Sequence, residues 1–324
     1  MKEKDFKSLL KNIEKEYGKG SIMSFSNNQI VDDVEVISTG SILLDDATGI
    51  GGYPKGRIIE VYGPESSGKT TMALLAIAEA QKQKNSGLAA FIDAEHAIDI
   101  KHAERMGVNL EKILISQPDS GEQALQLVDH LVSTGEFSII VVDSVAALTP
   151  IVELEGNMED QTIGAQARLL SKSMRKLSGI INKTNTIVIF INQIREKVGI
   201  IFGNPEVTPG GKALKFASSL RIDIRIKERI KEKEVFIGQR IKIKVVKNKM
   251  ASPYREVETI FYYKNGINKS EEILELAIKK GIVKQSGSWY YFNDKKLGQG
   301  KTATSKLISG TKVENEIYEK IFSK

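Results

Sequence analysis

The sequence contains Gly63-Pro64-Glu65-Ser66-Ser67-Gly68-Lys69-Thr70, which matches the phosphate-loop pattern G-x-x-x-x-G-K-[ST]. The apolar run Arg57–Tyr62 predicts a strand before it, and Lys69–Lys84 predicts a helix after it. Glycines at such a turn let backbone N–H groups surround phosphates at the helix N-terminus, where the helix dipole favours negative charge. We therefore expect a nucleotide site in which Lys69 reaches the β- and γ-phosphates and the Thr70 hydroxyl ligates Mg²⁺.

Further apolar, β-branched runs predict a sheet around this loop. The predicted strands are Leu88–Asp93, Lys112–Ser116, Ser138–Asp143 and Thr186–Ile191, with helices at Gly121–Thr134 and Ala165–Asn182. Apolar strands that alternate with helices indicate an α/β fold with a mostly parallel sheet covered on both faces. Leu220–Lys227 and Arg240–Lys247 instead alternate apolar and charged residues, so we place them towards the edge, with one wetter face.

Two of the predicted core strands end in acidic residues. Asp143 ends one strand, and we expect it beside the metal because the carboxyl ends of parallel strands form the ligand-binding edge. Asp93 and Glu95 end another. A nucleotide hydrolase needs a carboxylate to orient or deprotonate the attacking water. Glu95 is the candidate, with Asp93 as structural support, although from these residues alone simple capping by both acids explains the pattern equally well.

The N-terminal segment predicts a short amphipathic helix. Its apolar face consists of Phe6, Leu9, Leu10, Ile13 and Tyr17, and Gly18 and Gly20 end it. A helix of this length cannot bury its stripe alone, so it packs on its own chain or on a neighbouring subunit. The pattern alone favours packing within the chain.

After Gly266 the pattern changes to a small α+β unit. A helix is predicted at Ser270–Lys280, a strand at Ser288–Phe292, a further segment at Lys301–Ser309, and a final helix. From Asn268 onward there are eleven lysines and seven acidic residues, a difference of +4 out of a total net charge of +6. A basic surface fits a polyanionic partner but does not require one.

Bulk composition excludes several classes of protein. The chain has 324 residues, no cysteine and no apolar run long enough to span a bilayer, so disulfides, thiolate metal sites and membrane helices are not expected. The start, Met1–Phe6, is charged and does not look like a signal peptide. We therefore expect a cytoplasmic protein without a membrane partner.

Several strings together resemble the bacterial RecA recombinases. They are Gly63–Thr71, Phe91–His96, Val141–Pro150, Ile191–Arg195, Phe202–Pro205 and Lys244–Lys249. The resemblance runs from about Lys19 to Lys301 in one order, and it is far more specific than the phosphate loop. It implies three parts: an N-terminal oligomerisation helix and linker at 1–33, a RecA-type P-loop ATPase core at 34–267, and a C-terminal α+β lobe at 268–324 that binds duplex DNA.

The resemblance also implies roles at the nucleotide. Glu95 matches the glutamate that activates water, and Gln193 matches the residue that senses the γ-phosphate and passes its state to a DNA-binding loop. Lys247 and Lys249 match a pair that reaches the γ-phosphate across a subunit interface. Together with Lys69, these four residues are the catalytic residues that the resemblance implies. Thr71, Asp99 and Tyr263 complete the nucleotide site, and His102 stands where the family commonly has a tyrosine stacked on adenine.

Two polar stretches, 153–164 and 194–211, match the family's loops that hold single-stranded DNA. Both follow strands at the carboxyl edge of the sheet. Ile163 and Val198 match apolar side chains that wedge between base triplets. The implied phosphate contacts come from Arg168, Ser171, Arg175 and Lys197 and from the backbone amides of Gly210 and Gly211.

The implied function is a DNA-dependent ATPase that forms helical filaments on single-stranded DNA and catalyses homologous pairing and strand exchange in repair. ATP and Mg²⁺ are the expected cofactors. Single- and double-stranded DNA, further copies of the chain and an SOS repressor of the LexA type, whose self-cleavage it co-activates, are the expected partners. The alternative is a hexameric DNA helicase on the same ATPase fold, which would usually carry a separate N-terminal domain. A small-molecule kinase is a third possibility, but nothing resembles a lid or an acceptor site.

Overall fold

The structure is a computed structural model, and it describes residues 3–18, 21–22, 34–84, 86–157, 159–160, 162–197, 199, 203 and 205–322. The chain divides into two compact units, Met1–Glu35 and Val36–Lys324. The first contains α1 (Glu3–Tyr17), which confirms the predicted helix. It ends where Gly18 adopts φ +95° and donates its N–H to Glu14 O at 3.0 Å. Docking of α1 on a neighbouring copy stays a prediction.

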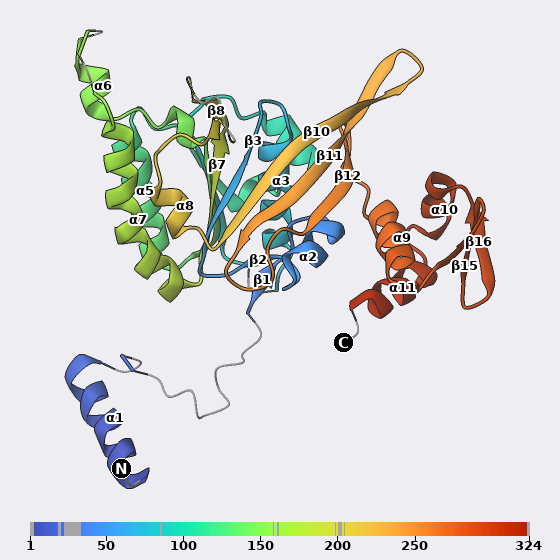
Figure 1. Cartoon of the computed structure of the whole chain (residues 1–324), viewed down its shortest axis with the longest axis horizontal. Coiled ribbons are helices and arrows are strands. Elements are labelled where there is room, and N and C mark those ends of the chain that lie inside the picture. The colour runs from blue at the N-terminus through green and yellow to red at the C-terminus, as the bar shows by residue number, and fades with distance from the viewer. Residues whose placement is uncertain are drawn as a thin grey trace. The chain divides into compact units, whose positions relative to one another are not determined.

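The second unit is built on a nine-stranded sheet with the order β13-β12-β11-β10-β3-β7-β6-β4-β5 (Figure 1). The parallel strands are β3 (Ile58–Gly63), β4 (Leu88–Asp93), β5 (Ile113–Ser116), β6 (Phe137–Asp143) and β7 (Ile187–Gln193). Strand β10 (Leu220–Glu232) pairs in parallel with β3, and from β10 onward the pairing is antiparallel, through β11 (Val235–Asn248), β12 (Glu256–Tyr262) and β13 (Gly266–Ile267). This confirms the predicted α/β class and the placement of the charged strands towards one edge.

Two hydrophobic cores lie on opposite faces of this sheet. Helix α3 (Lys69–Gln81) covers one face, and α5 (Gly121–Thr134) and α7 (Ala165–Thr184) cover the other. Successive residues of β6 alternate between them: Ile139 belongs to the first core and Ile140 to the second, as the two-residue period of a strand requires. Both faces of β3, β6 and β7 are therefore dry, which explains why their sequences are continuous apolar runs, whereas the edge strand β5 exposes Leu114 and Ile115.

Strands β10 and β11 are longer than their sequence predicts. They pair to Glu232↔Val235, so the hairpin extends past the predicted ends at Lys227 and Arg240 and projects beyond the sheet (Figure 1). Its outer part carries exposed Val235 and Phe236 among lysines and glutamates. The outer ends of β10 and β11 could not be predicted from the sequence, because the outer hairpin has no buried face and its charged residues look like those of a loop.

Several short elements connect the sheet. They are β1 (Val36–Ile37), α2 (Ile42–Thr48), β2 (Tyr53–Pro54), α4 (Ile100–Arg105), α6 (Ile151–Glu155), β8 (Arg195–Glu196), β9 (Glu206–Val207), α8 (Ala213–Ala217) and two single 3₁₀ turns, Leu110–Lys112 and Val145–Ala147. The C-terminal lobe contains α9 (Lys269–Lys279), β14 (Lys284–Ser286), β15 (Trp289–Phe292), β16 (Lys295–Gln299), α10 (Lys301–Ile308) and α11 (Lys312–Phe322). Of these elements, α9, β15, α10 and α11 match the α+β unit expected there, whereas β14 and β16 were not predicted.

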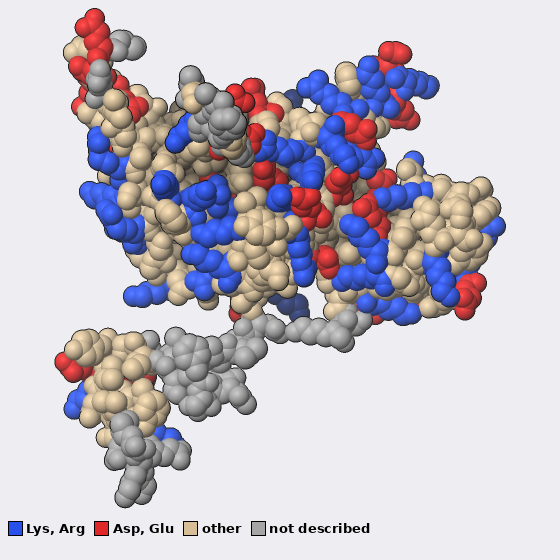
Figure 2. Space-filling view, viewed as in Figure 1, with Lys and Arg blue, Asp and Glu red and all other residues tan. Residues whose placement is uncertain are grey.

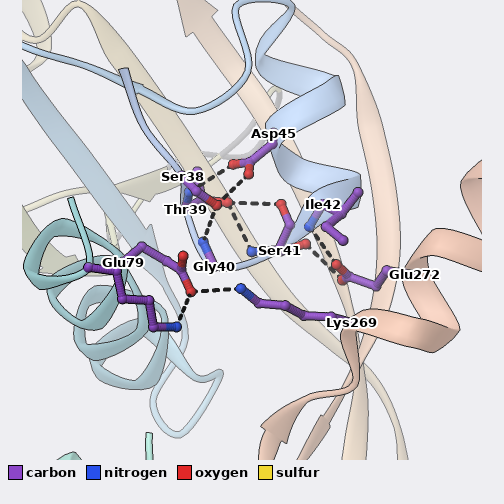
Figure 3. A network of polar contacts seen from close by, with 10 residues as sticks. Ser38, Thr39, Gly40, Ser41, Ile42, Asp45, Glu79, Lys269 and Glu272 are labelled. Carbon is purple, nitrogen blue, oxygen red and sulfur yellow. Dashed lines mark hydrogen bonds and ion pairs between the residues drawn. The ribbon is translucent and has the colours of Figure 1, made fainter. Parts of the chain in front are cut away.

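A buried carboxylate joins this lobe to the domain of the nine-stranded sheet. Glu272 of α9 accepts hydrogen bonds from Ser41 Oγ at 2.8 Å and from the Ile42 N–H at 2.6 Å, at the N-terminus of α2 (Figure 3). Beside it, Lys269 forms an ion pair with Glu79 of α3 at 2.7 Å. Burial raises the pKa of Glu272 to about 7, although these hydrogen bonds act in the opposite direction.

Candidate nucleotide and DNA sites

The phosphate loop turns from β3 into α3 as its sequence predicts. Gly68 adopts φ +95°, and a Cβ at this position would run into the ring of Phe261, so only glycine fits. Lys69 is buried, and its Nζ donates to Pro64 O at 2.6 Å. This hydrogen bond connects the end of the phosphate loop to its beginning. Gln239 of β11 supports the loop from outside, with Nε2 3.1 Å from Ser66 O.

The predicted metal ligands lie next to each other. Thr70 Oγ1 donates to Asp143 Oδ2 at 2.6 Å, at the carboxyl end of β6. Burial raises the pKa of Asp143 to about 6. The described residues contain no cluster of three or more His, Asp or Glu side chains arranged for a metal. This pair fits Mg²⁺, which binds through one or two protein oxygens and otherwise takes phosphate oxygens and water.

Glu95 and Gln193 are in contact with each other, although 97 residues separate them in the sequence. Gln193 ends β7, and its Nε2 donates to Glu95 Oε1 at 2.8 Å. The Ser144 hydroxyl donates to the same carboxylate oxygen. Asp93 has a structural role. Its carboxylate accepts from the N–H groups of Ala97 and Ile98, each at 3.1 Å, and from Gln117 Nε2 at 2.9 Å. Of the two acids, only Glu95 points to residues of the nucleotide edge.

A pocket of about 340 Å³ adjoins the phosphate loop, within the size range of small-molecule sites. Its lining comprises Ser66, Ser67, Gly68, Lys69, Thr70, Thr71, His102, Gln239, Phe261, Tyr262 and Tyr263. His102 Nε2 lies 3.0 Å from Thr71 Oγ1. Tyr263 lines this pocket, and its contact with a base stays a prediction. Asp99 does not line the pocket; its Oδ1 caps α4 by accepting from His102 N at 3.0 Å.

Lys247 and Lys249 lie apart from this pocket. Lys247 Nζ donates to the carbonyl oxygens of Lys215 and Phe216 at 2.7 and 3.0 Å, and Lys249 Nζ is 3.4 Å from Phe216 O. Burial and the nearby cations Lys249 and Arg221 lower the pKa of Lys247 to about 8. Within one chain, the two lysines do not complete the phosphate site.

The two predicted DNA loops contain more regular structure than expected. The first was expected to begin at Glu153, but α6, whose N-cap is Pro150, continues to Glu155. The second contains a small ribbon in which Arg195 pairs with Val207 and Glu196 with Glu206. Two-residue strands show no periodicity in a sequence, so the ribbon could not be predicted.

The predicted DNA contacts follow α7 and the end of the second loop. Ile163 is 80% exposed just before α7, and Arg168 and Arg175 lie on the exposed side of that helix with Ser171 between them. Exposed Lys and Arg side chains continue along α7 (Figure 2); they are Arg168, Lys172, Arg175, Lys176 and Lys183. A row of this kind matches a phosphate backbone.

The second loop ends in two glycines packed on α7. Gly210 and Gly211 adopt φ +83° and +75°, and a Cβ on Gly211 would lie 2.9 Å from the Ala167 Cβ. Lys197 is exposed. Val198 lies outside the described residues. The loop is thus held against the helix that carries the basic row.

Comparison with known proteins identifies the family. The RecA N-terminal domain family matches residues 4–268, and the RecA C-terminal domain family matches residues 271–324. The chain belongs to the RecA family. Protein RecA of Cereibacter sphaeroides is 54% identical over 99% of this chain and 93% of its own length. Protein RecA of Mycoplasma mobile is 53% identical over 99% and 96%, and that of Enterococcus hirae 56% identical over 93% and 86%.

RecA membership confirms the predicted recombinase and favours it over the hexameric helicase. The protein is a DNA-dependent ATPase that uses ATP and Mg²⁺ and acts in DNA recombination, DNA repair and the SOS response. RecA proteins bind single- and double-stranded DNA, form filaments of their own copies and interact with repressors of the LexA type. Among the described helices, none is long and apolar enough to cross a membrane.

Sequence reasoning missed three residues of the RecA nucleotide pocket. Gln239, Phe261 and Tyr262 come from β11 and β12, which the parallel-sheet pattern did not connect to the phosphate loop. The alternating run Glu256–Tyr262 was the available signal for β12. Its contact with Gly68 depends on strand pairing across the sheet, and one sequence cannot provide that pairing.

Proposed function

We propose that Glu95 and Gln193 form the unit that couples ATP hydrolysis to DNA in this RecA protein. The observation that carries the proposal is the 2.8 Å hydrogen bond from Gln193 Nε2 to Glu95 Oε1. Glu95 follows β4, and Gln193 ends β7 directly before the second DNA loop. One contact therefore links the candidate base to the candidate DNA-binding segment.

In this proposal the chain's own residues divide the work. The backbone of Gly63–Thr71 and the Lys69 ammonium bind the phosphates, and Thr70 and Asp143 hold Mg²⁺, which stabilises the charge that develops on the transferred phosphoryl group. Glu95 accepts a proton from the attacking water. Gln193 keeps the Glu95 carboxylate engaged, and it releases that carboxylate when its amide turns towards the γ-phosphate. Tyr263 and His102 contact the base. Asp99 contributes indirectly, because it caps the N-terminus of α4, the helix that carries His102.

Hydrolysis in this scheme needs a second copy of the chain. We propose that Lys247 and Lys249 reach the γ-phosphate held by an adjacent copy, and their distance from the chain's own pocket supports this assignment. A cation supplied in this way stabilises transition-state charge as an arginine finger does.

For DNA, we propose that 153–164 and 194–211 hold a single strand. Ile163 and Val198 are assigned as wedges, Arg168, Ser171, Arg175 and Lys197 as phosphate contacts, and Gly210 and Gly211 as amide donors. The proposed parts of the chain are 1–33 for oligomerisation, 34–267 for ATP and single-stranded DNA, and 268–324 for duplex DNA. The proposed compartment is the cytoplasm, where a bacterial recombinase meets its DNA.

The test is ATP hydrolysis with and without single-stranded DNA across a salt series. Strong stimulation that fades with salt is expected for the parent, because phosphate contacts release counterions. Gln193→Ala should bind ATP nearly as the parent does but lose the stimulation, and Glu95→Gln should lose hydrolysis itself. Gln285→Ala in the C-terminal lobe and Glu104→Gln on α4 are the matched controls. Equal stimulation in Gln193→Ala and the parent would refute the coupling role.

A further inference from the structure

A buried ion pair lies inside the sheet, next to the strand that ends in Gln193. Arg221 of β10 donates from Nε to Glu60 Oε2 of β3 at 2.5 Å. Both residues are almost fully buried, and the Arg221 guanidinium also stacks on the Tyr62 ring at 4.6 Å from its centre. A buried ion pair gains little stability because two charges lose their hydration. The pair is better explained by what its remaining hydrogen-bonding capacity holds in place.

That capacity is used by Asn192, the penultimate residue of β7. Asn192 is 0% exposed, and its Nδ2 lies 3.1 Å from Glu60 Oε1 and 3.2 Å from Pro209 O. Its Oδ1 accepts from the Gln193 N–H at 3.0 Å. One carboxamide thus contacts the rigid ion pair, the backbone of Gln193 and a carbonyl near the end of the second DNA loop.

Because the loop begins after Gln193 and ends at Gly211, the bond from Asn192 to Pro209 closes its neck. We propose that Asn192, fixed by the Glu60–Arg221 pair, is the positioning residue that transmits the state of Gln193 to this neck. The proposal rests on the proposed coupling role of Gln193. A turn of Gln193 towards nucleotide shifts the peptide between residues 192 and 193, and the Asn192 carboxamide must follow because it accepts from that N–H. Pro209 then moves with it.

The same ion pair extends towards the proposed cross-subunit cation. Arg221 is the cross-strand partner of Lys247 in the β10–β11 ladder. The Arg221 charge lowers the pKa of Lys247 and the Glu60 charge raises it, so both charges interact electrostatically with this lysine. The pair therefore lies between the chain's own Gln193 and the lysine that it offers to an adjacent copy.

The experiment compares Asn192→Ala with Thr186→Ala in the full chain. Thr186 precedes β7, is 0% exposed and hydrogen-bonds to Thr184, so its variant also removes a buried polar group beside the same strand. Asn192→Ala should keep the KM for ATP and the DNA-free rate while the stimulation by single-stranded DNA falls about tenfold. Thr186→Ala should keep the stimulation. A normal stimulation factor in Asn192→Ala overturns the proposal.

Amide hydrogen exchange provides a readout that a merely structural role would not move. In the parent, a non-hydrolysable ATP analogue should slow exchange at both the phosphate loop and residues 205–212. In Asn192→Ala only the phosphate loop should respond; protection at both sites would contradict the proposal. If Asn192→Ala does not fold, Asn192→Ser keeps a hydroxyl whose single proton cannot serve both Glu60 and Pro209, and the same losses are expected.

Different outcomes would overturn the coupling role of Gln193 and the positioning role of Asn192. A parent protein whose hydrolysis ignores DNA would remove the proposed function, and the inference with it. A parent that responds to DNA, together with an Asn192→Ala variant that responds equally, would remove only the inference.

Discussion

In the parallel half of the sheet, β3, β4, β6 and β7 are buried on both faces, and their carboxyl ends bring together Lys69, Asp143, Glu95 and Gln193. In the antiparallel half, β10, β11 and β12 alternate buried and partly exposed residues over part of their length, and Lys247 is the penultimate residue of β11. The first half contains a phosphate site within one chain. The second half carries cations that this site does not use. On the proposed function, one chain is equipped to bind ATP, and rapid turnover requires a second chain to supply these cations.

Removing Lys247 should give the largest effect, because it tests the half that needs a partner. Lys247→Ala should still form filaments but hydrolyse ATP about a thousandfold more slowly, as expected for loss of a finger-type cation. Hydrolysis and filament length by electron microscopy measure this. Lys244→Ala on the same strand, ion-paired to Glu256 at 2.8 Å, is the control. A normal turnover number in Lys247→Ala would count against the cross-subunit role.

A mixture of variants sharpens the same comparison. Lys247→Ala retains Glu95, and Glu95→Gln retains Lys247, so mixed filaments contain intact composite sites. With random assembly of equal amounts, about a quarter of the interfaces should recover activity. Two inactive variants that stay inactive together would show that the sites are complete within single chains.

Gly68→Ala tests the half that works alone. A methyl group there meets Phe261 at a positive φ, so the loop must shift, and kcat/KM for ATP should fall about a hundredfold. Gly135→Ala is the matched control, because Gly135 also has positive φ (+73°) but no atom within 4 Å of the added Cβ. Binding of a fluorescent nucleotide distinguishes the two, and similar losses in both variants would mean that backbone strain alone is responsible.

The pKa of Lys247 predicts a pH dependence for the partner-dependent half. With this pKa lowered to about 8, the lysine carries its charge below pH 8 and loses it as the pH rises further. The kcat/KM for ATP, which reports groups of the free protein, should therefore fall up to about tenfold for each pH unit above 8. Lys247→Arg, whose guanidinium stays charged, should give a flatter profile. Identical profiles would exclude this group as the cause.

The smallest expected effect concerns the junction of the C-terminal lobe. Because the pKa of Glu272 rises from 4.5 to about 7 on folding, the folded protein holds this proton more tightly than the unfolded chain does. Stability should therefore be greatest below pH 4.5 as far as this group is concerned, and its contribution is lost as the pH rises to about 7. Thermal unfolding should show a Tm about 2–4 °C less pH-dependent in Glu272→Gln than in the parent between pH 5 and 8.

The junction experiment has its own internal check. Burial also raises the pKa of Asp45 to about 6, so part of the pH dependence should remain in Glu272→Gln and disappear only when Asp45 is changed too. An unchanged profile in Glu272→Gln would mean that this carboxyl keeps the same protonation state throughout.

Apolar runs and the phosphate loop were enough to predict most of the parallel half. Helix Gly121–Thr134 and strand Leu88–Asp93 have the predicted ends, because dry faces and good caps leave little freedom. The antiparallel half was harder to predict, since the outer hairpin buries little and its charged residues look like a loop.

The site divides in the same way. Positions fixed by a local motif, such as Lys69 and Thr70, could be predicted from the residues themselves. Gln193 and Lys247 could be assigned only through the family resemblance, and nothing local pointed to Gln239, which reaches the phosphate loop through the pairing of β11 with β12. Contacts between distant strands depend on register, and that information is spread over the whole chain.

Strand β11 contacts the chain's own phosphate loop through Gln239 and ends at the lysines assigned to the next one. Lys247 lies eight positions beyond Gln239, which is about 26 Å of extended backbone. On the assignment of Lys247 to an adjacent copy, β11 therefore fixes the distance between its contact with one phosphate loop and the lysine for the next. Inserting two residues between Gln239 and Lys247 should move that lysine by about 7 Å along the strand and weaken its reach to the adjacent γ-phosphate.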